Sequence, residues 1–192
     1  MRTLLIVFLF TSALVAERPR DDWKLKPFDW ESHLTHSLAE APLTANERDQ
    51  IYRIVDEDVH DSFGDAERAE ERKAVMSFRV GSVALARNGS EQILVRGTGA
   101  FCGGTGNCSM WIFVRHDPEL RLALGTEGQV LIVRNSFTQG FHDIAVGLHD
   151  SAFMMDYTVY RWDSFTYKQA DCYAAIFPID GGSSIPAIKG CR

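Results

Sequence analysis

From residue 77 to residue 177 the chain alternates short apolar segments with shorter segments of turn-forming residues. After SFRVGSVALA, the apolar segments are EQILVR, SMWIFV, LRLAL, QVLIV, FHDIAVGL, AFMMDYTVYRW and TYKQADCYAAIF. Segments of this length, bounded by Gly, Asn, Asp or Ser, are typical of β-strands. Strands joined by so few residues run antiparallel, because a parallel connection needs a crossover of a dozen or more residues. The pattern therefore predicts an antiparallel meander of about eight strands.

Two local features of this region predict irregular backbone. The apolar positions of SFRVGSVALA change phase at Gly81-Ser82, which predicts a β-bulge. Asn88-Gly89 between two strand segments is typical of a two-residue type I′ hairpin turn.

The residues before the meander carry helical signals. Thr44 and Glu47 have the spacing of a capping box, in which each side chain satisfies a free backbone N–H at a helix start. An apolar stripe at helical spacing follows, formed by Ile51, Ile54, Val55 and Val59. DAERAEERKAVM (65–76) predicts a second, more charged helix. The fold class is therefore α+β, with two N-terminal helices packed on one face of a curved antiparallel sheet.

The N-terminus has the pattern of a secretory signal peptide. MRTLLIVFLFTSALVA (1–16) has one basic residue, then an apolar run from Leu4 to Phe10, then small residues. The run is shorter than the ~20 apolar residues of a spanning helix, so we expect cleavage after Ala16 and no membrane span in the mature protein. Residues 17–42 hold three of the six prolines and predict an extended arm, with Trp23, Phe28 and Trp30 packed on the body. Residues 43–192 then form one α+β domain, and the protein is secreted or periplasmic.

The charge of the chain excludes one large class of partner. The formal net charge is −6, and removal of Arg2 with the leader leaves 26 acidic and 19 basic residues. An acidic surface repels the phosphates of nucleic acids and anionic lipid headgroups. We therefore expect no nucleic-acid partner, and a cationic partner suits this charge better.

The stretch GTGAFCGGTGNC (97–108) combines glycines with two of the four cysteines, which is compatible with a phosphate-binding loop, a metal site, a redox site or a disulfide-closed turn. Thr105 stands where a phosphate-binding P-loop needs Lys, and Cys102 stands where a dinucleotide fingerprint needs its third Gly. The spacing C-x5-C fits neither a zinc knuckle nor a C-x-x-C redox site. We therefore expect no cofactor and no metal at these residues.

An even number of cysteines after a signal peptide is typical of disulfide bonds. Four cysteines allow three pairings. We predict the two local bonds, Cys102–Cys108 and Cys172–Cys191. In the chain-entropy model they stabilise the fold by roughly 2.4 and roughly 3.3 kcal/mol.

Two segments resemble a known repeat. GFHDIAVG (140–147) resembles the strand signature of FG-GAP and VCBS-type repeats, and LARNGSEQILVRG (85–97) is a weaker copy. The span 44–177 is also similar to uncharacterised secreted bacterial proteins that carry C-G-x-x-G-N-C, here residues 102–108. These resemblances imply β-hairpins and an extracytoplasmic, bacterial setting. They do not imply calcium, because RNGSE and RNSFTQG supply at most the carboxylate of Glu91 where the repeats have several carboxylates.

Two His-Asp pairs, at 142–143 and 149–150, are the candidate catalytic residues. Asp143 with His142 or His149 would serve a hydrolase as an acid–base pair. Side chains alternate along a strand, so in an unbroken strand His142 points to the face of Ile144 and Val146 while Asp143 and His149 point to the other. A bulge at Gly147 would bring the histidines together. The pattern therefore favours structural roles for these residues and leaves an envelope hydrolase as the alternative.

Taken together, the residues predict a disulfide-stabilised, non-catalytic binding protein of the cell envelope or medium. Its partner would be an envelope protein or glycan bound by loops on a rigid sheet, as in an inhibitor or immunity protein.

Mass spectrometry of the protein recovered from the medium or periplasm, without reduction, tests the export prediction. We expect a mature chain that begins at Glu17 and carries no alkylatable thiol. An intact residue 1–16 segment, or any free thiol among the four cysteines, would contradict it.

Overall fold

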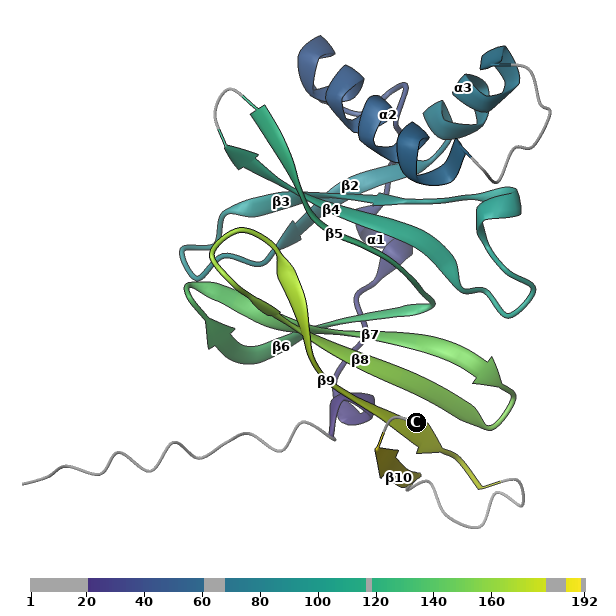
Figure 1. Cartoon of the computed structure of the whole chain (residues 1–192), viewed down its shortest axis with the longest axis vertical. Helices are drawn as coiled ribbons and strands as arrows, with labels where there is room; N and C mark the ends of the chain where they lie inside the picture. Colours follow the sequence, from purple (N-terminus) through teal and green to yellow (C-terminus); the bar gives the residue numbers. More distant parts are fainter. Residues whose placement is uncertain (1–20, 61–67, 117–118, 179–185, 191–192) are drawn as a thin grey trace, which may run out of the picture.

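In the computed structural model, two five-stranded antiparallel sheets lie face to face, and two helices cover the outer face of one sheet (Figure 1). The structure describes residues 21–60, 68–116, 119–178 and 186–190. The predicted signal peptide (1–16) and the first residues of the predicted arm lie outside these ranges.

Each sheet is a meander of consecutive strands. The first sheet has the order β1 (His36–Ser37), β2 (Arg79–Ala84), β3 (Glu91–Arg96), β4 (Cys108–His116) and β5 (Glu119–Gly128). The second sheet has the order β10 (Ala187–Gly190), β9 (Tyr167–Ile176), β8 (Met154–Trp162), β7 (Phe141–Ser151) and β6 (Val130–Thr138). The α+β class and the antiparallel connections agree with the sequence prediction.

The prediction of one continuous curved sheet is wrong. Gln129 alone separates β5 from β6, and there the chain passes from the first sheet to the second. A side chain on Gly128 would place its Cβ 2.4 Å from Val146 Cγ1 and 3.1 Å from the Gly147 carbonyl oxygen. The two sheets therefore come together at a position where only glycine fits.

A hydrophobic cluster fills the space between the sheets. It includes Leu94, Met110, Ile112 and Leu124 from the first sheet, and Leu131, Ile144 and Val146 from the second. All of these side chains are buried. They alternate along their strands with residues of the outer faces, as the period of two requires.

Helices α2 (Ala45–Val59) and α3 (Arg68–Met76) cover the outer face of the first sheet (Figure 1). The capping box at Thr44 is confirmed: the Glu47 N–H donates to Thr44 Oγ1 at 3.1 Å, and the Thr44 N–H donates to Glu47 Oε2 at 2.9 Å. The buried stripe of α2 packs with Phe78, Phe113 and Trp111. The Trp111 indole N–H donates to Asp58 Oδ2 at 2.7 Å, which satisfies the polar atom of this buried ring.

The N-terminal segment, residues 21–42, packs against both the inter-sheet cluster and the outer face of the second sheet. Residues 21–42 contain a 3₁₀ turn, η1 (Asp22–Lys24), a one-turn helix, α1 (Trp30–His33), and the strand β1. As expected, Trp23, Phe28 and Trp30 pack on the body, Trp23 against the outer cluster of the second sheet and the other two against the inter-sheet cluster.

A buried ion pair fastens this segment to the second sheet. Asp22 is 1% exposed, and its Oδ1 accepts a hydrogen bond from Arg134 Nε at 2.7 Å. The Tyr173 hydroxyl donates to Asp22 Oδ2 at 2.9 Å, and burial together with this carboxylate raises the pKa of Tyr173. The opposite charges of Asp22 and Arg134, with the second hydrogen bond from Tyr173, make the burial of these groups tolerable.

Two local predictions on β2 and its hairpin are wrong for identifiable reasons. The pairing of β2 with β3 is continuous from Arg79 to Ala84, so there is no bulge at Gly81. A Cβ on Gly81 would lie 1.9 Å from the His33 carbonyl oxygen. Glycine is therefore required at this position because the N-terminal segment passes so close to it. In the next turn Gly89 has φ 77° but Asn88 does not have a positive φ, which excludes type I′. The Gly89 N–H donates to the Ala86 carbonyl, so the tight turn spans residues 86–89 and begins one residue earlier than predicted.

The predicted disulfide Cys102–Cys108 is confirmed. It closes the loop between β3 and β4, and Asn107 in this loop bonds to the backbone of His149 on β7, donating to its carbonyl at 3.0 Å and accepting from its N–H at 2.9 Å. Cys172 is disulfide-bonded. Cys191, its predicted partner, lies outside the described residues.

We expect Asp22→Asn to lower the free energy of unfolding by about 3–5 kcal/mol, because it leaves the Arg134 guanidinium buried without its counter-charge. Asp21→Asn is the matched control, since Asp21 pairs with Lys24 at the surface, where such pairs contribute about 0–1 kcal/mol. Urea unfolding measures both variants. Equal effects of the two substitutions would contradict the anchoring role of Asp22.

Candidate functional site

Three turns from three different hairpins meet at one end of the two-sheet structure. We call them the turn cluster: residues 85–90 between β2 and β3, 138–141 between β6 and β7, and 163–166 between β8 and β9 (Figure 1). The Arg87 N–H donates to the Gly140 carbonyl at 2.8 Å, and the His142 N–H donates to the Leu85 carbonyl at 2.7 Å. These bonds tie the first sheet to the second, so the turns form one continuous surface.

Backbone strain is concentrated in the turn cluster. Among the described residues, only Gln139 (φ 50°) and Ser164 (φ 84°) combine a positive φ with a side chain other than glycine. They lie in two different turns, and the Ser164 hydroxyl donates to the Gln139 side-chain carbonyl. Such residues cost about 1–3 kcal/mol each and persist where the surrounding structure holds them, often at functional sites.

The turn after β8 presents an aromatic side chain to solvent. Phe165 is 63% exposed, the highest value among the large hydrophobic residues described. Asp163 holds the turn, because its Oδ1 accepts from the N–H groups of Phe165 at 2.9 Å and Thr166 at 2.8 Å. These backbone hydrogen bonds lower the pKa of Asp163. Phe165 therefore projects from a turn whose conformation is already set.

Two arginines stack on aromatic rings in the same surface. The Arg121 guanidinium carbon lies 5.4 Å from the centre of the Phe165 ring and 5.8 Å from that of Trp162. Arg87 lies 4.9 Å from the centre of the Phe137 ring. Within the described ranges, neither arginine takes part in an ion pair. Arg121 Nε is also buried without a hydrogen-bond partner. The surface thus offers two ordered cations that the described chain does not neutralise.

The structure places the predicted acid–base residue Asp143 in a closed network. Asp143 is 3% exposed and accepts hydrogen bonds from Ser136 Oγ at 2.8 Å and Thr138 Oγ1 at 2.7 Å. Arg161 Nε lies 3.7 Å from its Oδ2. The alternation predicted Asp143 to lie on the outer face of the second sheet, and at this position the side chain on that face is buried.

The two predicted histidines do not join Asp143. His142 Nδ1 lies 2.5 Å from the Arg134 carbonyl oxygen, and its ring contacts that of Phe137 at an interplanar angle of 37° with centroids 3.9 Å apart. His149 lies near the other end of β7, and its Nδ1 is buried without a hydrogen-bond partner. No hydrogen bond or ion pair among the described residues links either ring to Asp143. Glu91, the carboxylate named above in connection with calcium, is exposed at the start of β3.

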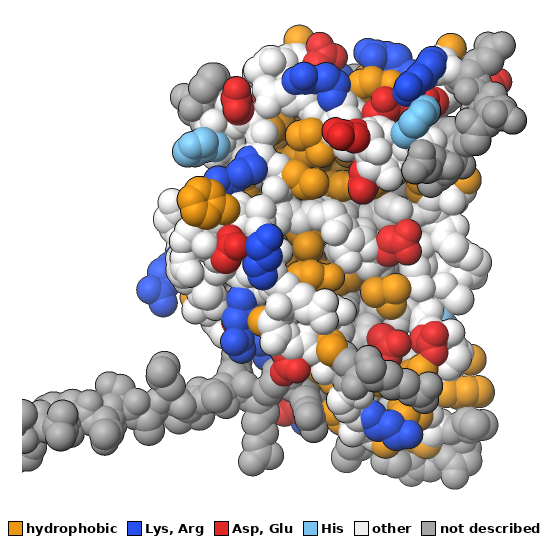
Figure 2. Space-filling view, in the orientation of Figure 1, with side chains coloured by type: hydrophobic (Ala, Val, Ile, Leu, Met, Phe, Trp, Pro, Cys, Tyr) orange, Lys and Arg blue, Asp and Glu red, His pale blue; other side chains and the backbone are white. Residues whose placement is uncertain are grey.

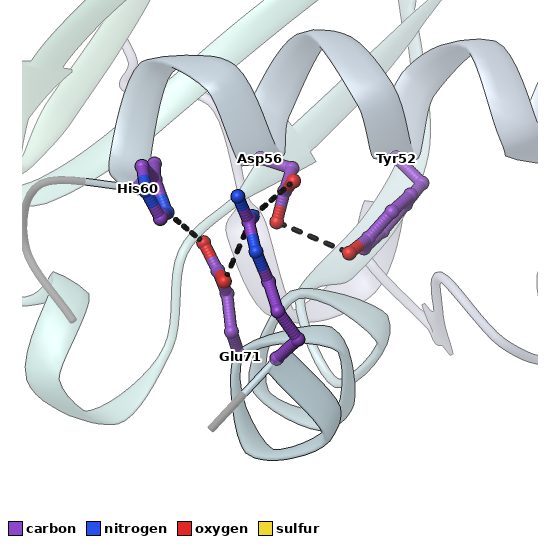
Figure 3. A network of polar contacts seen from close by, with 5 residues as sticks. Tyr52, Asp56, His60 and Glu71 are labelled. Atoms are coloured by element: carbon purple, nitrogen blue, oxygen red, sulfur yellow. Dashed lines mark hydrogen bonds and ion pairs between the residues drawn. The ribbon is translucent and has the colours of Figure 1, made fainter. Parts of the chain in front are cut away.

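A second polar cluster joins α2 to α3 (Figure 3). Glu71 is 1% exposed, and its carboxylate lies 2.7 Å from His60 Nδ1 and 3.1 Å from Arg68 Nη1. Arg68 also lies 3.4 Å from Asp56, which accepts from the Tyr52 hydroxyl at 3.1 Å. Each carboxylate here faces a cation or hydroxyl of the chain itself, which is the arrangement of a structural contact between helices.

Within the described parts of the chain, no group of three or more His, Cys, Asp or Glu residues has the arrangement of a metal site. None of the helices in those parts combines the length and apolar character of a bilayer-spanning helix. Comparisons of the chain with protein families, with curated proteins and with solved structures found no match.

Sequence reasoning missed the residues that make the turn cluster distinctive. Arg121 lies on β5, Gln139 follows β6, and Ser164 and Phe165 follow β8, so no spacing rule connects the three positions. Their turns were recognisable as NSFTQG and WDSF. What the sequence lacked was the sheet pairing that brings these turns to the same end.

The network around Glu71 predicts a pH dependence of stability. The hydrogen bond from His60 and the charge of Arg68 lower the pKa of Glu71. A carboxyl group whose pKa is lowered by folding stabilises the protein above its unfolded pKa of about 4.3, and this contribution is lost as the pH falls through the folded pKa. We expect Glu71→Gln to flatten the dependence of unfolding free energy on pH below about 4.3.

Denaturant unfolding between neutral and acidic pH measures this effect. Glu70→Gln removes an equal charge from an exposed position of the same helix and serves as the control. An equal flattening by both variants would contradict the role of the buried contacts.

Proposed function

We propose that this chain is a non-catalytic binding protein of the cell envelope or medium that engages a protein partner through the turn cluster. The observation that carries the proposal is Phe165, an exposed aromatic side chain held on a preset turn beside the guanidinium of Arg121. Aromatic residues, Phe included, and arginine are enriched at protein interfaces, where a few anchoring side chains carry most of the binding energy.

The rigidity of the turn cluster favours binding. Association costs about 0.5–1.5 kcal/mol for each flexible side chain that must be ordered. Here the hydrogen bonds of Asp163 and the Gln139–Ser164 contact order the turns before any partner arrives. The positive φ values of Gln139 and Ser164 then have a functional explanation, because they hold the turn that presents Phe165.

The shape of the site suggests the kind of partner. A projecting side chain is the convex counterpart of a pocket, so we infer a partner with an apolar pocket that receives Phe165. The enclosed cleft of an enzyme is such a pocket, which is consistent with an inhibitor or immunity role. The contacts of Asp143 with Ser136, Thr138 and Arg161 support binding over the alternative of hydrolysis, because they occupy the carboxylate that hydrolysis would use.

Local charge refines the expectation drawn from the net charge. Figure 2 shows acidic and basic side chains interspersed over the face that it draws. Charge complementarity with a partner on this face therefore depends on the few side chains at the interface and not on the net charge. Among the described residues, Arg87 in the turn cluster and Arg121 beside it on β5 belong to no ion pair, while the Asp163 carboxylate is bound by backbone N–H groups of its own turn. We infer that the partner's pocket is bordered by carboxylates, although the chain as a whole is acidic.

A capture experiment with the purified chain, using envelope and medium fractions of the source cells, tests the proposal. We expect one protein partner to be retained, and Phe165→Ala to weaken its binding by about 2 kcal/mol or more, roughly 30-fold. Arg121→Gln should weaken it as well, with a smaller dependence of the remaining affinity on salt.

Phe153→Ala is the matched control. Phe153 is 40% exposed, and its turn lies at the opposite end of β7. Unchanged melting temperatures of these variants would show that affinity, and not folding, is affected. Capture that survives Phe165→Ala, or binding only to glycans, would overturn the proposal.

A further inference from the structure

A small pocket lies between the N-terminal segment and the inner face of the first sheet, at the end of β2 opposite to the turn cluster. It has a volume of about 310 Å³. Its walls are Trp30, Glu31 and Leu34 from α1 and the residue after it, Arg79 on β2, Arg96 on β3, and the Cys102–Cys108 disulfide. The pocket thus includes the glycine- and cysteine-rich stretch for which the sequence predicts only a structural disulfide.

Two arginines face each other across the pocket floor. Arg79 and Arg96 are direct partners in the register of β2 and β3. Like charges directly opposite on neighbouring strands destabilise a sheet, so the pair has an energetic cost that the fold must offset.

Neither arginine is neutralised within the described residues. The seven ion pairs found there do not include Arg79 or Arg96. Arg96 Nε is buried without a hydrogen-bond partner, and the one contact of its Nη2 is 3.4 Å from the Gly106 carbonyl oxygen. Burial lowers the pKa of the Arg96 guanidinium. A partly buried guanidinium without a counter-ion is destabilised, so an anionic occupant of the pocket is favoured.

Both guanidinium groups are held in place. Arg79 donates from Nε and Nη2 to the Leu34 carbonyl, at 3.0 and 2.7 Å. The Arg96 guanidinium carbon lies 4.5 Å from the centre of the Trp30 ring, and Trp30 is fixed in turn by a 2.9 Å hydrogen bond from its indole to the Gln129 carbonyl. Donors that are ordered in advance bind with a smaller entropic cost.

We propose that this pocket binds a single carboxylate group carried on a small apolar molecule or chain end. The planar fork of arginine matches the two oxygens of a carboxylate. Leu34 and the disulfide provide an apolar wall for the stem. Glu31 lowers the charge of the pocket to about that of one cation, so one carboxylate neutralises it, whereas a phosphate, which carries ≈ −1.5 to −2, would leave an uncompensated negative charge in the pocket.

Calorimetric titration of the full mature chain tests the proposal with three probes. N-acetylphenylalanine carries one carboxylate on an apolar stem, N-acetylphenylalaninamide differs from it only by the loss of that charge, and inorganic phosphate is a bare anion. We expect the acid to bind at least ten times more tightly than the amide and more tightly than phosphate. Binding of acid and amide with equal affinity, absence of binding by the acid, or preference for phosphate would each overturn it.

Arg96→Gln separates a binding role from a structural one. We expect it to weaken binding of the acid at least tenfold while leaving the melting temperature of the unliganded protein unchanged or higher, because it removes an unpaired buried charge. Arg79→Gln should weaken binding to a similar degree and keeps the test open if Arg96→Gln fails to fold. Binding retained in both variants would contradict the site.

The control is Arg53→Gln, which removes an exposed arginine from α2, on the other side of the first sheet from the pocket. It should leave binding of the acid unchanged. Because the turn cluster and the pocket lie at opposite ends, loss of partner capture in Phe165→Ala and loss of carboxylate binding in Arg96→Gln are independent results. Either proposal can therefore fail without the other.

Discussion

Each sheet of this protein has two largely apolar faces, and the need to keep all four faces out of water determines the architecture. Face-to-face packing buries only two of them, through Met110 and Ile112 on one side and Ile144 and Val146 on the other. The outer face of the first sheet is buried by α2 and α3, and that of the second is covered in part by Trp23 and Leu25 of the N-terminal segment. The passage from β5 to β6 through Gln129 is what makes this layering possible, because it ends one meander and begins the other.

The buried polar groups divide into two kinds. Asp22, Glu71 and Asp143 are carboxylates held by donors of the chain itself, and their contacts link elements that hydrophobic packing alone would leave free to slide. Arg96 and Arg121 are different, since each has a buried Nε without a hydrogen-bond partner. Structural networks in proteins are satisfied internally, and unsatisfied buried groups in a native structure call for a reason such as a ligand. The two arginines with such a buried Nε lie at the two surfaces that we propose for binding.

Local interactions made part of this fold predictable. The capping box needs only Thr44 and Glu47 three residues apart, and the Cys102–Cys108 bond closes a loop of glycines; both depend on neighbours in the chain, and both are confirmed. The antiparallel connections follow from short turns for the same reason. Predictions failed where a distant segment intervened. At Gly81 the glycine was noticed but misread as a bulge, because the carbonyl of His33 that excludes a side chain comes from the N-terminal segment.

The candidate sites show the same limit. Asp143, His142 and His149 were predicted as catalytic candidates because they lie close together in the chain, yet none of the described hydrogen bonds or ion pairs joins either histidine ring to Asp143. Phe165 and Arg121 are 44 positions apart and meet only because β5 and β8 belong to sheets stacked on one another. The sequence by itself determined the strands from β2 to β9, the helix start and the local disulfide, since these depend on backbone sterics and short-range chemistry. Tertiary structure alone decided which turns share an end and which arginines remain unpaired, because sheet stacking and strand register are set by burial summed over the whole chain.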